Sequence, residues 1–188
     1  GIMSFKGDGI EMNKKEAAKY FKISSDKGQI YSMHNYGVML FNGYGDVGVN
    51  KNEAIKLFKN AASKGCVEAM YKLALIYYHG IGIQSNKSES SKYFKLAADN
   101  GHANSLFNYG YMLFNGDGID SDKNEAIKYY KLAIEKEQVN AMFNFGLCLF
   151  KGNGIEMNKK EAAKFFKMAA DKGHLSAMYN YALLLANG

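Results

Sequence analysis

A glycine recurs at an almost constant interval along this chain of 188 residues. Successive members of the column lie 36, 37, 36, 36 and 36 residues apart, at Gly7, Gly43, Gly80, Gly116, Gly152 and Gly188. A glutamate keeps the same interval, at Glu16, Glu53, Glu89, Glu125 and Glu161. The one extra residue falls in segment 43–50, and stacked repeats tolerate insertions in their loops. The chain therefore consists of about five copies of one supersecondary unit, with no linker and no second domain.

The boundaries of the copies follow from the same columns. We expect a single array with units near residues 1–30, 31–67, 68–103, 104–139 and 140–175, and a partial unit at 176–188. Gly1 aligns with Gly37, so the array begins inside a helix of its first unit, and it ends inside a unit as well. We therefore expect a fragment of a longer array.

Each unit contains a helix that begins with a capping signal, here called helix B. A capping residue stands three positions before the column glutamate, at Asn13, Asn50, Asn86, Asp122 and Asn158. This spacing is a capping box, in which the side chain accepts a backbone N–H and the glutamate reaches back to the cap. Apolar residues at helical spacing and a later glycine such as Gly65 complete the pattern. The predicted B helices cover residues 14–27, 51–64, 87–100, 123–136 and 159–172.

The other helix of each unit, helix A, is apolar on two faces. Ala69, Leu73 and Tyr77 form one face, and Tyr71, Leu75 and Tyr78 form a second. A small residue recurs on this helix and allows close packing, at Gly37, Ala74, Gly110, Gly146 and Ala182. A helix that is buried on two sides lies between its own helix B and the next unit. The expected fold is all-α, a right-handed α-solenoid of stacked antiparallel helix pairs with a 36-residue period. We expect no β-sheet.

The residues that carry these columns also resemble a known family. The segment AMYKLALIYYHGIGI at 69–83 and the later KLAADNG at 95–101 are similar to the Sel-1-like repeat, a longer-looped relative of the tetratricopeptide repeat. The resemblance extends over the whole chain and departs from the usual pattern at Ser24-Ser25 and at Glu137. It implies a helical solenoid that acts as an adaptor within larger assemblies.

Few residues in the chain suggest catalysis, a metal or a cofactor. His102 and His174 share one loop position two units apart, too distant to bind a common ion, and the cysteines Cys66 and Cys148 have no metal-binding spacing. Asp117, Asp120 and Asp122 form one acidic cluster, but Asp122 is already a predicted cap. The GxG segments follow no strand and occur in every unit, which favours turns over phosphate binding. We expect no catalytic residue, metal or cofactor. In the resembled family, members with a disulfide in each repeat look like β-lactam-hydrolysing proteins, but two unpaired cysteines depart from that pattern.

Lysine dominates the charge of the chain. The formal net charge is +6, and the sequence contains no Arg and no Pro. Fifteen of the 24 lysines fall in three columns of helix B, with no aromatic residues interleaved, and in the resembled family this helix lies on the convex outside. A solubilising face is the preferred interpretation, and docking on an anionic membrane or nucleic acid is the alternative. The absence of Arg argues against specific recognition of nucleic acid.

A polar stripe on helix A is the most informative feature for function. Asn in a helix interior costs about 0.5 kcal/mol relative to Ala, so its repetition suggests a use. One column contains Asn35, Lys72, Asn108, Asn144 and Asn180, and another contains Asn42, His79, Asn115, Lys151 and Asn187. Apolar residues lie between them, at Met39, Ile76, Met112, Cys148 and Leu184. We expect a concave groove that binds a peptide or a domain of another protein, lined by Asn35, Met39, Asn42, Lys72, Ile76, His79, Asn108, Met112, Asn115, Asn144, Lys151 and Asn180. The simpler alternative is that Asn only keeps this wall hydrated.

The sequence does not identify the partner or the pathway. No apolar run approaches the roughly 18 residues of a membrane-spanning helix. The two cysteines neither require nor exclude a reducing compartment, so the location stays open, with the cytoplasm slightly favoured.

Overall fold

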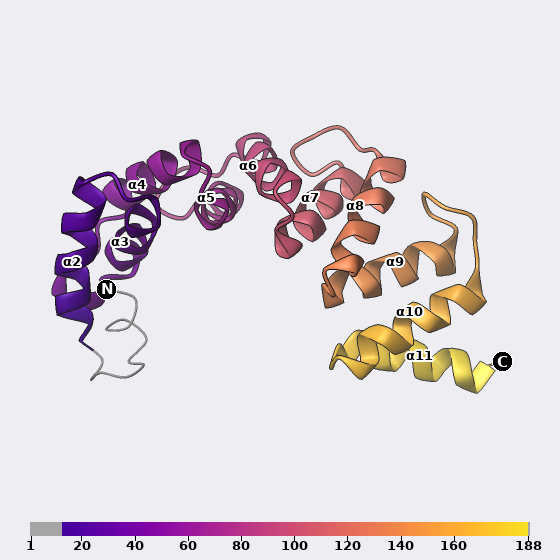
Figure 1. Ribbon diagram of the computed structural model, residues 1–188. Helices are drawn as coiled ribbons and strands as arrows, with labels where there is room; N and C mark the ends of the chain where they lie inside the picture. The colour runs from indigo at the N-terminus through magenta and orange to yellow at the C-terminus, as the bar shows by residue number, and fades with distance from the viewer. Residues whose placement is uncertain (1–12, 188) are drawn as a thin grey trace. The chain divides into compact units, whose positions relative to one another are not determined.

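The computed structural model describes residues 13–187, and in this range the chain is all-helical with no β-strand. Every α-helix of the described range has 13 residues. Figure 1 shows how these helices follow one another along the chain. The B helices are α2 (Lys14–Asp26), α4 (Lys51–Ser63), α6 (Lys87–Asp99), α8 (Lys123–Glu135) and α10 (Lys159–Asp171). The A helices are α3 (Ile30–Asn42), α5 (Val67–His79), α7 (Ala103–Asn115), α9 (Val139–Lys151) and α11 (Leu175–Asn187). The predicted B helices are thus confirmed, each ending one residue earlier than expected.

The helices group into two compact units that divide within α6. The N-terminal unit is Gly1–Tyr93 and the C-terminal unit is Phe94–Gly188. Within the C-terminal unit, α7 packs on α8, α8 on α9, α9 on α10 and α10 on α11. Within the N-terminal unit, α2, α3, α4 and α5 pack in the same sequential way. None of the described helices is long and apolar enough to cross a membrane.

The one-residue insertion of the second repeat forms local structure of its own. A short 3-10 helix, η1 (Tyr44–Asp46), occupies the loop between α3 and α4. Asp46 has a positive φ of 61°, and η1 packs against α2. The insertion is therefore accommodated in the loop, without a change in the length of either neighbouring helix.

The predicted caps of the B helices are present, although one half of the capping box differs. The side chain of each cap accepts the backbone N–H of the column glutamate at 2.9–3.0 Å. At four of the caps, the expected return bond to the cap amide is replaced, because that amide donates to a carbonyl of the preceding A helix. Asn50 donates to Leu40, and Asn158 to Leu149, both at 2.8 Å. The cap therefore also joins helix A to helix B.

Removing one of these caps tests their contribution to stability. We expect Asn86→Ala to lower the free energy of unfolding by about 1 kcal/mol, because the N–H of Glu89 loses its acceptor at 2.9 Å. Urea denaturation followed by circular dichroism measures the change. Asn86→Asp retains an acceptor oxygen and serves as the control, and an equal loss in both variants would contradict a capping role.

The turn after each B helix requires a left-handed residue. Gly65 and Gly173 have φ of 91° and 90°, whereas the departure noted at Glu137 places a non-glycine residue at φ 58°. The turn is otherwise the same, because the amides after Glu137 and Gly173 each donate to a helix carbonyl at 3.0 Å. Glu137 pairs with Lys172 at 3.0 Å, but both side chains are well exposed and such pairs contribute little. Glu137 is therefore held in a conformation that is unfavourable for an L-residue.

Replacing this glutamate is expected to stabilise the protein. We predict that Glu137→Gly raises the free energy of unfolding by about 1 kcal/mol, since glycine adopts positive φ without steric cost. The control is Glu135→Gly, which places glycine at the last residue of α8, where the backbone is right-handed, and should not stabilise the protein. Both are read from urea denaturation. A loss of stability in Glu137→Gly would show that the ion pair outweighs the backbone strain.

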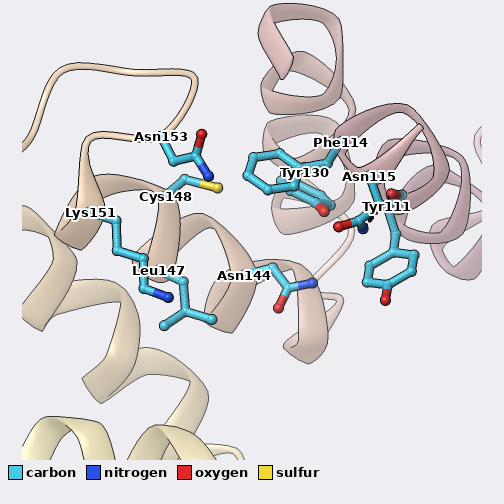
Figure 2. A pocket seen from close by; sticks show the side chains of 9 residues that line it. All are labelled: Tyr111, Phe114, Asn115, Tyr130, Asn144, Leu147, Cys148, Lys151 and Asn153. Carbon is cyan, nitrogen blue, oxygen red and sulfur yellow. Dashed lines mark hydrogen bonds between the residues drawn. The ribbon is translucent and has the colours of Figure 1, made fainter. Parts of the chain in front are cut away.

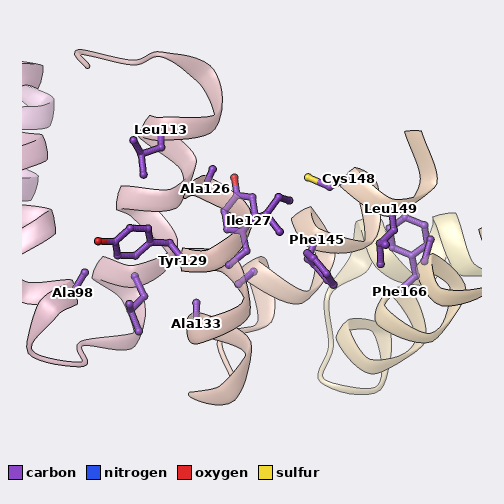
Figure 3. Close-up of a cluster of buried hydrophobic side chains, with 14 residues drawn as sticks. Ala98, Leu113, Ala126, Ile127, Tyr129, Ala133, Phe145, Cys148, Leu149 and Phe166 are labelled. Atoms are coloured by element: carbon purple, nitrogen blue, oxygen red, sulfur yellow. The ribbon is translucent and has the colours of Figure 1, made fainter. Parts of the chain in front are cut away.

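The small residues of the A helices make room for an aromatic ring. A methyl group at Gly146 would lie 2.8 Å from Cε1 of Phe166, and one at Gly37 would lie 2.8 Å from Cε1 of Phe58. Each ring belongs to the following B helix and is buried. In the C-terminal unit, Phe166 and Tyr130 belong to one buried cluster that joins α7, α8, α9 and α10 (Figure 3).

Candidate functional site

The two polar columns of helix A differ in exposure. The first column, which contains Asn35, Lys72, Asn108, Asn144 and Asn180, is half-buried. In the second column, the side chains of Asn42, His79, Asn115 and Lys151 are exposed. The ring of His79 lies edge-on to that of Tyr78, with centroids 5.0 Å apart. Both columns thus have solvent access on the surfaces of their own units.

Three of the apolar residues between these columns are core residues, which corrects the sequence interpretation for them. Met39, Ile76 and Met112 are 0%, 1% and 1% exposed. Helix A packs on both sides, so the narrow strip between the Asn columns is already covered by neighbouring side chains. These three residues cannot supply pockets to a ligand while the helices keep this packing.

Several of the asparagines use part of their hydrogen-bonding capacity within their own helix. The side-chain amide donates to the carbonyl four residues earlier at 2.7–2.8 Å in Asn42, Asn108, Asn115 and Asn180. An Asn amide has a second N–H and an acceptor oxygen, and these remain for a partner. The internal bond also holds the side chain against the helix, which explains how a helix interior tolerates this residue.

A pocket of about 200 Å³ opens beside these columns in the C-terminal unit. It brings together three of the predicted site residues, Asn115, Asn144 and Lys151. Figure 2 shows side chains of α7 on one side, side chains of α9 on the other, and Tyr130 of α8 next to Phe114. The complete lining is Tyr111, Phe114, Asn115, Tyr130, Asn144, Leu147, Cys148, Lys151 and Asn153.

The floor of this pocket is buried and uncharged. Burial raises the pKa of the Tyr130 hydroxyl, and the side-chain amide of Asn144 opposes this shift. Burial also raises the pKa of the Cys148 thiol to about 11, although the nearby Lys123 and Lys151 oppose this shift. The thiol is therefore protonated at neutral pH and offers no nucleophile. The pocket is suited to binding through its amides, its hydroxyls and one ammonium group.

Six lining residues were not among the predicted site residues: Tyr111, Phe114, Tyr130, Leu147, Cys148 and Asn153. Tyr130 lies on helix B and Asn153 lies in a loop, whereas the prediction considered one stripe of helix A. Tyr130 does occupy the aromatic column of the B helices, together with Phe58 and Phe166. That column indicated a core position for Tyr130. Only the packing of the helices shows that the Tyr130 side chain also reaches a pocket.

The equivalent position in the N-terminal unit carries its own cation. Lys72 occupies the repeat position of Asn144, and its ammonium group lies 5.1 Å from the centroid of the Phe41 ring. A contact of this kind stabilises a cation at a partly exposed site. A predicted site residue of the N-terminal unit thus also lies beside an aromatic side chain.

Two histidines of the loops have structural roles. Nδ1 of His102 accepts the backbone N–H of Ser105 at 3.2 Å, and Nδ1 of His174 accepts that of Ala177 at 3.1 Å. Both rings therefore cap the A helices that follow them. Over residues 13–187, no group of three or more His, Cys, Asp or Glu side chains is arranged to bind a metal ion.

Many of the lysines of the B helices have partners within the protein. Three pair with the column glutamate, at Lys56–Glu53, Lys92–Glu89 and Lys128–Glu125, with N–O distances of 3.6, 3.0 and 2.7 Å. Three more pair with an aspartate four residues later, at Lys22–Asp26, Lys95–Asp99 and Lys167–Asp171. These pairs reduce the positive charge that the surface of helix B presents.

Lysines at the first position of the B helices lie over aromatic rings. Their ammonium groups are 4.6–5.8 Å from the ring centroids, in Lys14–Tyr44, Lys51–Phe41, Lys87–Tyr78, Lys123–Phe114 and Lys159–Phe150. Lys19 also lies over Tyr20 of its own helix, at 6.0 Å. The expectation that no aromatic residues interleave with the lysines is therefore wrong. The rings are occupied by intramolecular cations, so they do not form a free stacking platform for nucleic-acid bases.

Comparison with known proteins identifies the repeat. A family model for the Sel1 repeat matches residues 1–29, 30–66, 67–102, 103–137 and 139–174. A comparison with curated protein sequences gave no match.

Solved structures with this fold come from several bacteria. A Sel1 repeat protein from Oxalobacter formigenes is 29% identical with a TM-score of 0.85, over 94% of this chain and 72% of that one. A protective antigen present in uropathogenic Escherichia coli strains, which displays an SLR fold, is 23% identical with a TM-score of 0.93. That match covers 100% of this chain, which spans 40% of the length of the antigen.

Proposed function

The chain belongs to the Sel1 repeat family, whose helical solenoids are generally non-enzymatic scaffolds for protein–protein interaction, and we propose that the A-helix surface of its C-terminal unit binds an extended segment of a partner protein. The observation that carries this proposal is the pocket between α7, α8 and α9, where Asn115, Asn144 and Lys151 converge beside an apolar floor. Ligand sites in proteins combine an apolar lining with a few polar groups in this way.

The hydrogen-bonding groups of the asparagines match those of a peptide backbone. Each Asn amide combines N–H donors with an acceptor oxygen, as a peptide group does. Asn108, Asn144 and Asn180 occupy one repeat position on α7, α9 and α11. Adjacent A helices should repeat about every 10 Å, one helix diameter. An extended chain rises about 3.3 Å per residue, so one asparagine meets roughly every third peptide group.

This mode of binding contacts the backbone of the segment and makes no specific contact with most of its side chains. The aromatic edge of Tyr111, which is 41% exposed, and the side chains of Phe114 and Leu147 add apolar contact area at the pocket. Aromatic residues with a polar end are common in protein interfaces. Affinity then comes from the backbone contacts and the pocket together.

A peptide selection tests the proposal. A library of random linear decapeptides, fused to carrier sequence at both ends, is selected against the purified chain, and the affinity of the recovered peptides is measured by fluorescence anisotropy. We expect the triple variant Asn108→Ala, Asn144→Ala, Asn180→Ala to bind them at least about tenfold more weakly, since several backbone hydrogen bonds are lost.

The control removes the same number of asparagines elsewhere. Asn52, Asn60 and Asn124 are exposed residues of the B helices, and their change to alanine should leave the affinity unchanged. Circular dichroism confirms that both triple variants are folded. If the A-helix variant remains folded and keeps the original affinity, the proposed role of the asparagines is wrong.

A further inference from the structure

The pocket of the C-terminal unit carries positive charge without a carboxylate in its lining. Among its nine lining residues, Lys151 is the charged side chain, and none is Asp or Glu. Lys123 lies at the same site, with its ammonium group 5.7 Å from the centroid of the lining residue Phe114. The exposed Asn115 and the half-buried Asn153 add amide donors to the lining. The site is therefore electrostatically complementary to an anion.

The form of this charge favours a carboxylate. A single lining ammonium group with neutral amide donors matches a group of charge −1. A phosphate group carries more charge than this single ammonium group balances, and this chain contains no Arg, whose guanidinium fork binds phosphate in a bidentate way. The apolar floor of Phe114, Leu147 and the protonated Cys148 excludes water on one side, which strengthens a charge-assisted hydrogen bond.

The position of the pocket favours a side chain over a chain end. Asn108 lies on α7 and Asn180 on α11, while the pocket is built around α9, which is between them in the order of packing. A segment that reaches both asparagines passes over the pocket at an internal residue. A free C-terminus bound here would leave one of the flanking asparagines without a peptide group to contact.

We propose that the pocket between α7, α8 and α9 receives an acidic side chain, Asp or Glu, from an internal position of the extended partner segment. This inference rests on the proposed function, because the segment must first lie along the A helices. Lys151 then determines specificity: it provides the charge that distinguishes an acidic residue from its neutral amide counterpart. Direct capture by one ammonium group also implies that binding weakens as salt screens the pair.

The test uses the same decapeptide library with the full chain and with two variants of equal charge. We expect peptides selected by the unmodified chain to share an acidic residue at one fixed internal position. Lys151→Gln should bind these peptides at least about tenfold more weakly, as expected for the loss of a charge-assisted hydrogen bond. Lys160→Gln, an exposed change on α10 outside the pocket, should leave the affinity unchanged. Replacing the Glu at the shared internal position of a peptide by Gln should lower the affinity as much as Lys151→Gln does.

The outcomes separate this inference from the function on which it rests. Peptides that lack a fixed acidic residue, yet lose affinity in the triple asparagine variant, would overturn the acidic specificity and leave the binding surface intact. Equal effects of Lys151→Gln and Lys160→Gln would also overturn it, by showing a response to net charge alone. A second library presents peptides with free C-termini. If these peptides bind more tightly through the terminal carboxylate, the inference of an internal acidic side chain is overturned. No enrichment in either library would overturn both proposals.

Discussion

Changing Phe166 to alanine is expected to lower the free energy of unfolding by about 3–5 kcal/mol, the largest effect that we predict for a single side chain. Phe166 is 1% exposed and fills the space beside Gly146. Its ring centroid lies 5.8 Å from that of Phe143 and 6.4 Å from that of Phe150. The loss would leave a cavity between α9 and α10, because glycine at 146 offers no side chain to fill it.

The matched control lies two residues further along α10. Met168 is 41% exposed, and Met168→Ala should change the free energy of unfolding by less than about 1 kcal/mol. The chain contains no Trp, so circular dichroism in urea is the suitable measurement. Similar losses in the two variants would contradict the assignment of Phe166 to the interface between helix A and helix B.

Changing Gly80 to valine is expected to cost about 3 kcal/mol, because two unfavourable effects add. Gly80 has φ 69°, a conformation that a β-branched residue adopts poorly. Its Cβ would also lie 2.9 Å from the backbone nitrogen of Ser85 and 3.1 Å from the carbonyl oxygen of Ile83. Backbone atoms cannot move aside as a flexible side chain does, so the loop 80–86 would have to rearrange.

Gly65→Val separates these two effects in the same unit. Gly65 also has a positive φ, 91°, but a Cβ there would meet no atom within 4 Å. This variant should show the conformational strain alone, about 1–2 kcal/mol. Urea denaturation of both variants gives the difference. If Gly65→Val is as destabilising as Gly80→Val, the close approach in the GxG loop is energetically unimportant.

Most of the fold was accessible to sequence reasoning because the repeat supplies the same local signals several times. Asn86, Glu89 and Gly80 each belong to a column, so the cap was supported by four further examples and the turn by five. Local hydrogen bonds decide these features, and their geometry depends on residues a few positions apart. The B helices consequently begin at the predicted residues.

The candidate site was predicted only in part. Helical periodicity placed Asn115, Asn144 and Lys151 on one face, and the structure does bring them to one pocket. The same periodicity placed Met39 and Met112 beside them, although both are buried. A helical wheel assigns an angle to each residue but does not show how far the neighbouring helices extend around it. The edge of a polar stripe is therefore its least predictable part.

Sequence alone was sufficient to establish the helix pairs, their caps and the identity of the columns, because these depend on interactions within one unit and are repeated in register. Tertiary packing decided which column residues face solvent, which rings lie under the lysines, and that Tyr130 and Asn153 join α9 at a common pocket. These outcomes depend on side chains from different helices that meet in space, and such contacts arise only when one unit packs against the next.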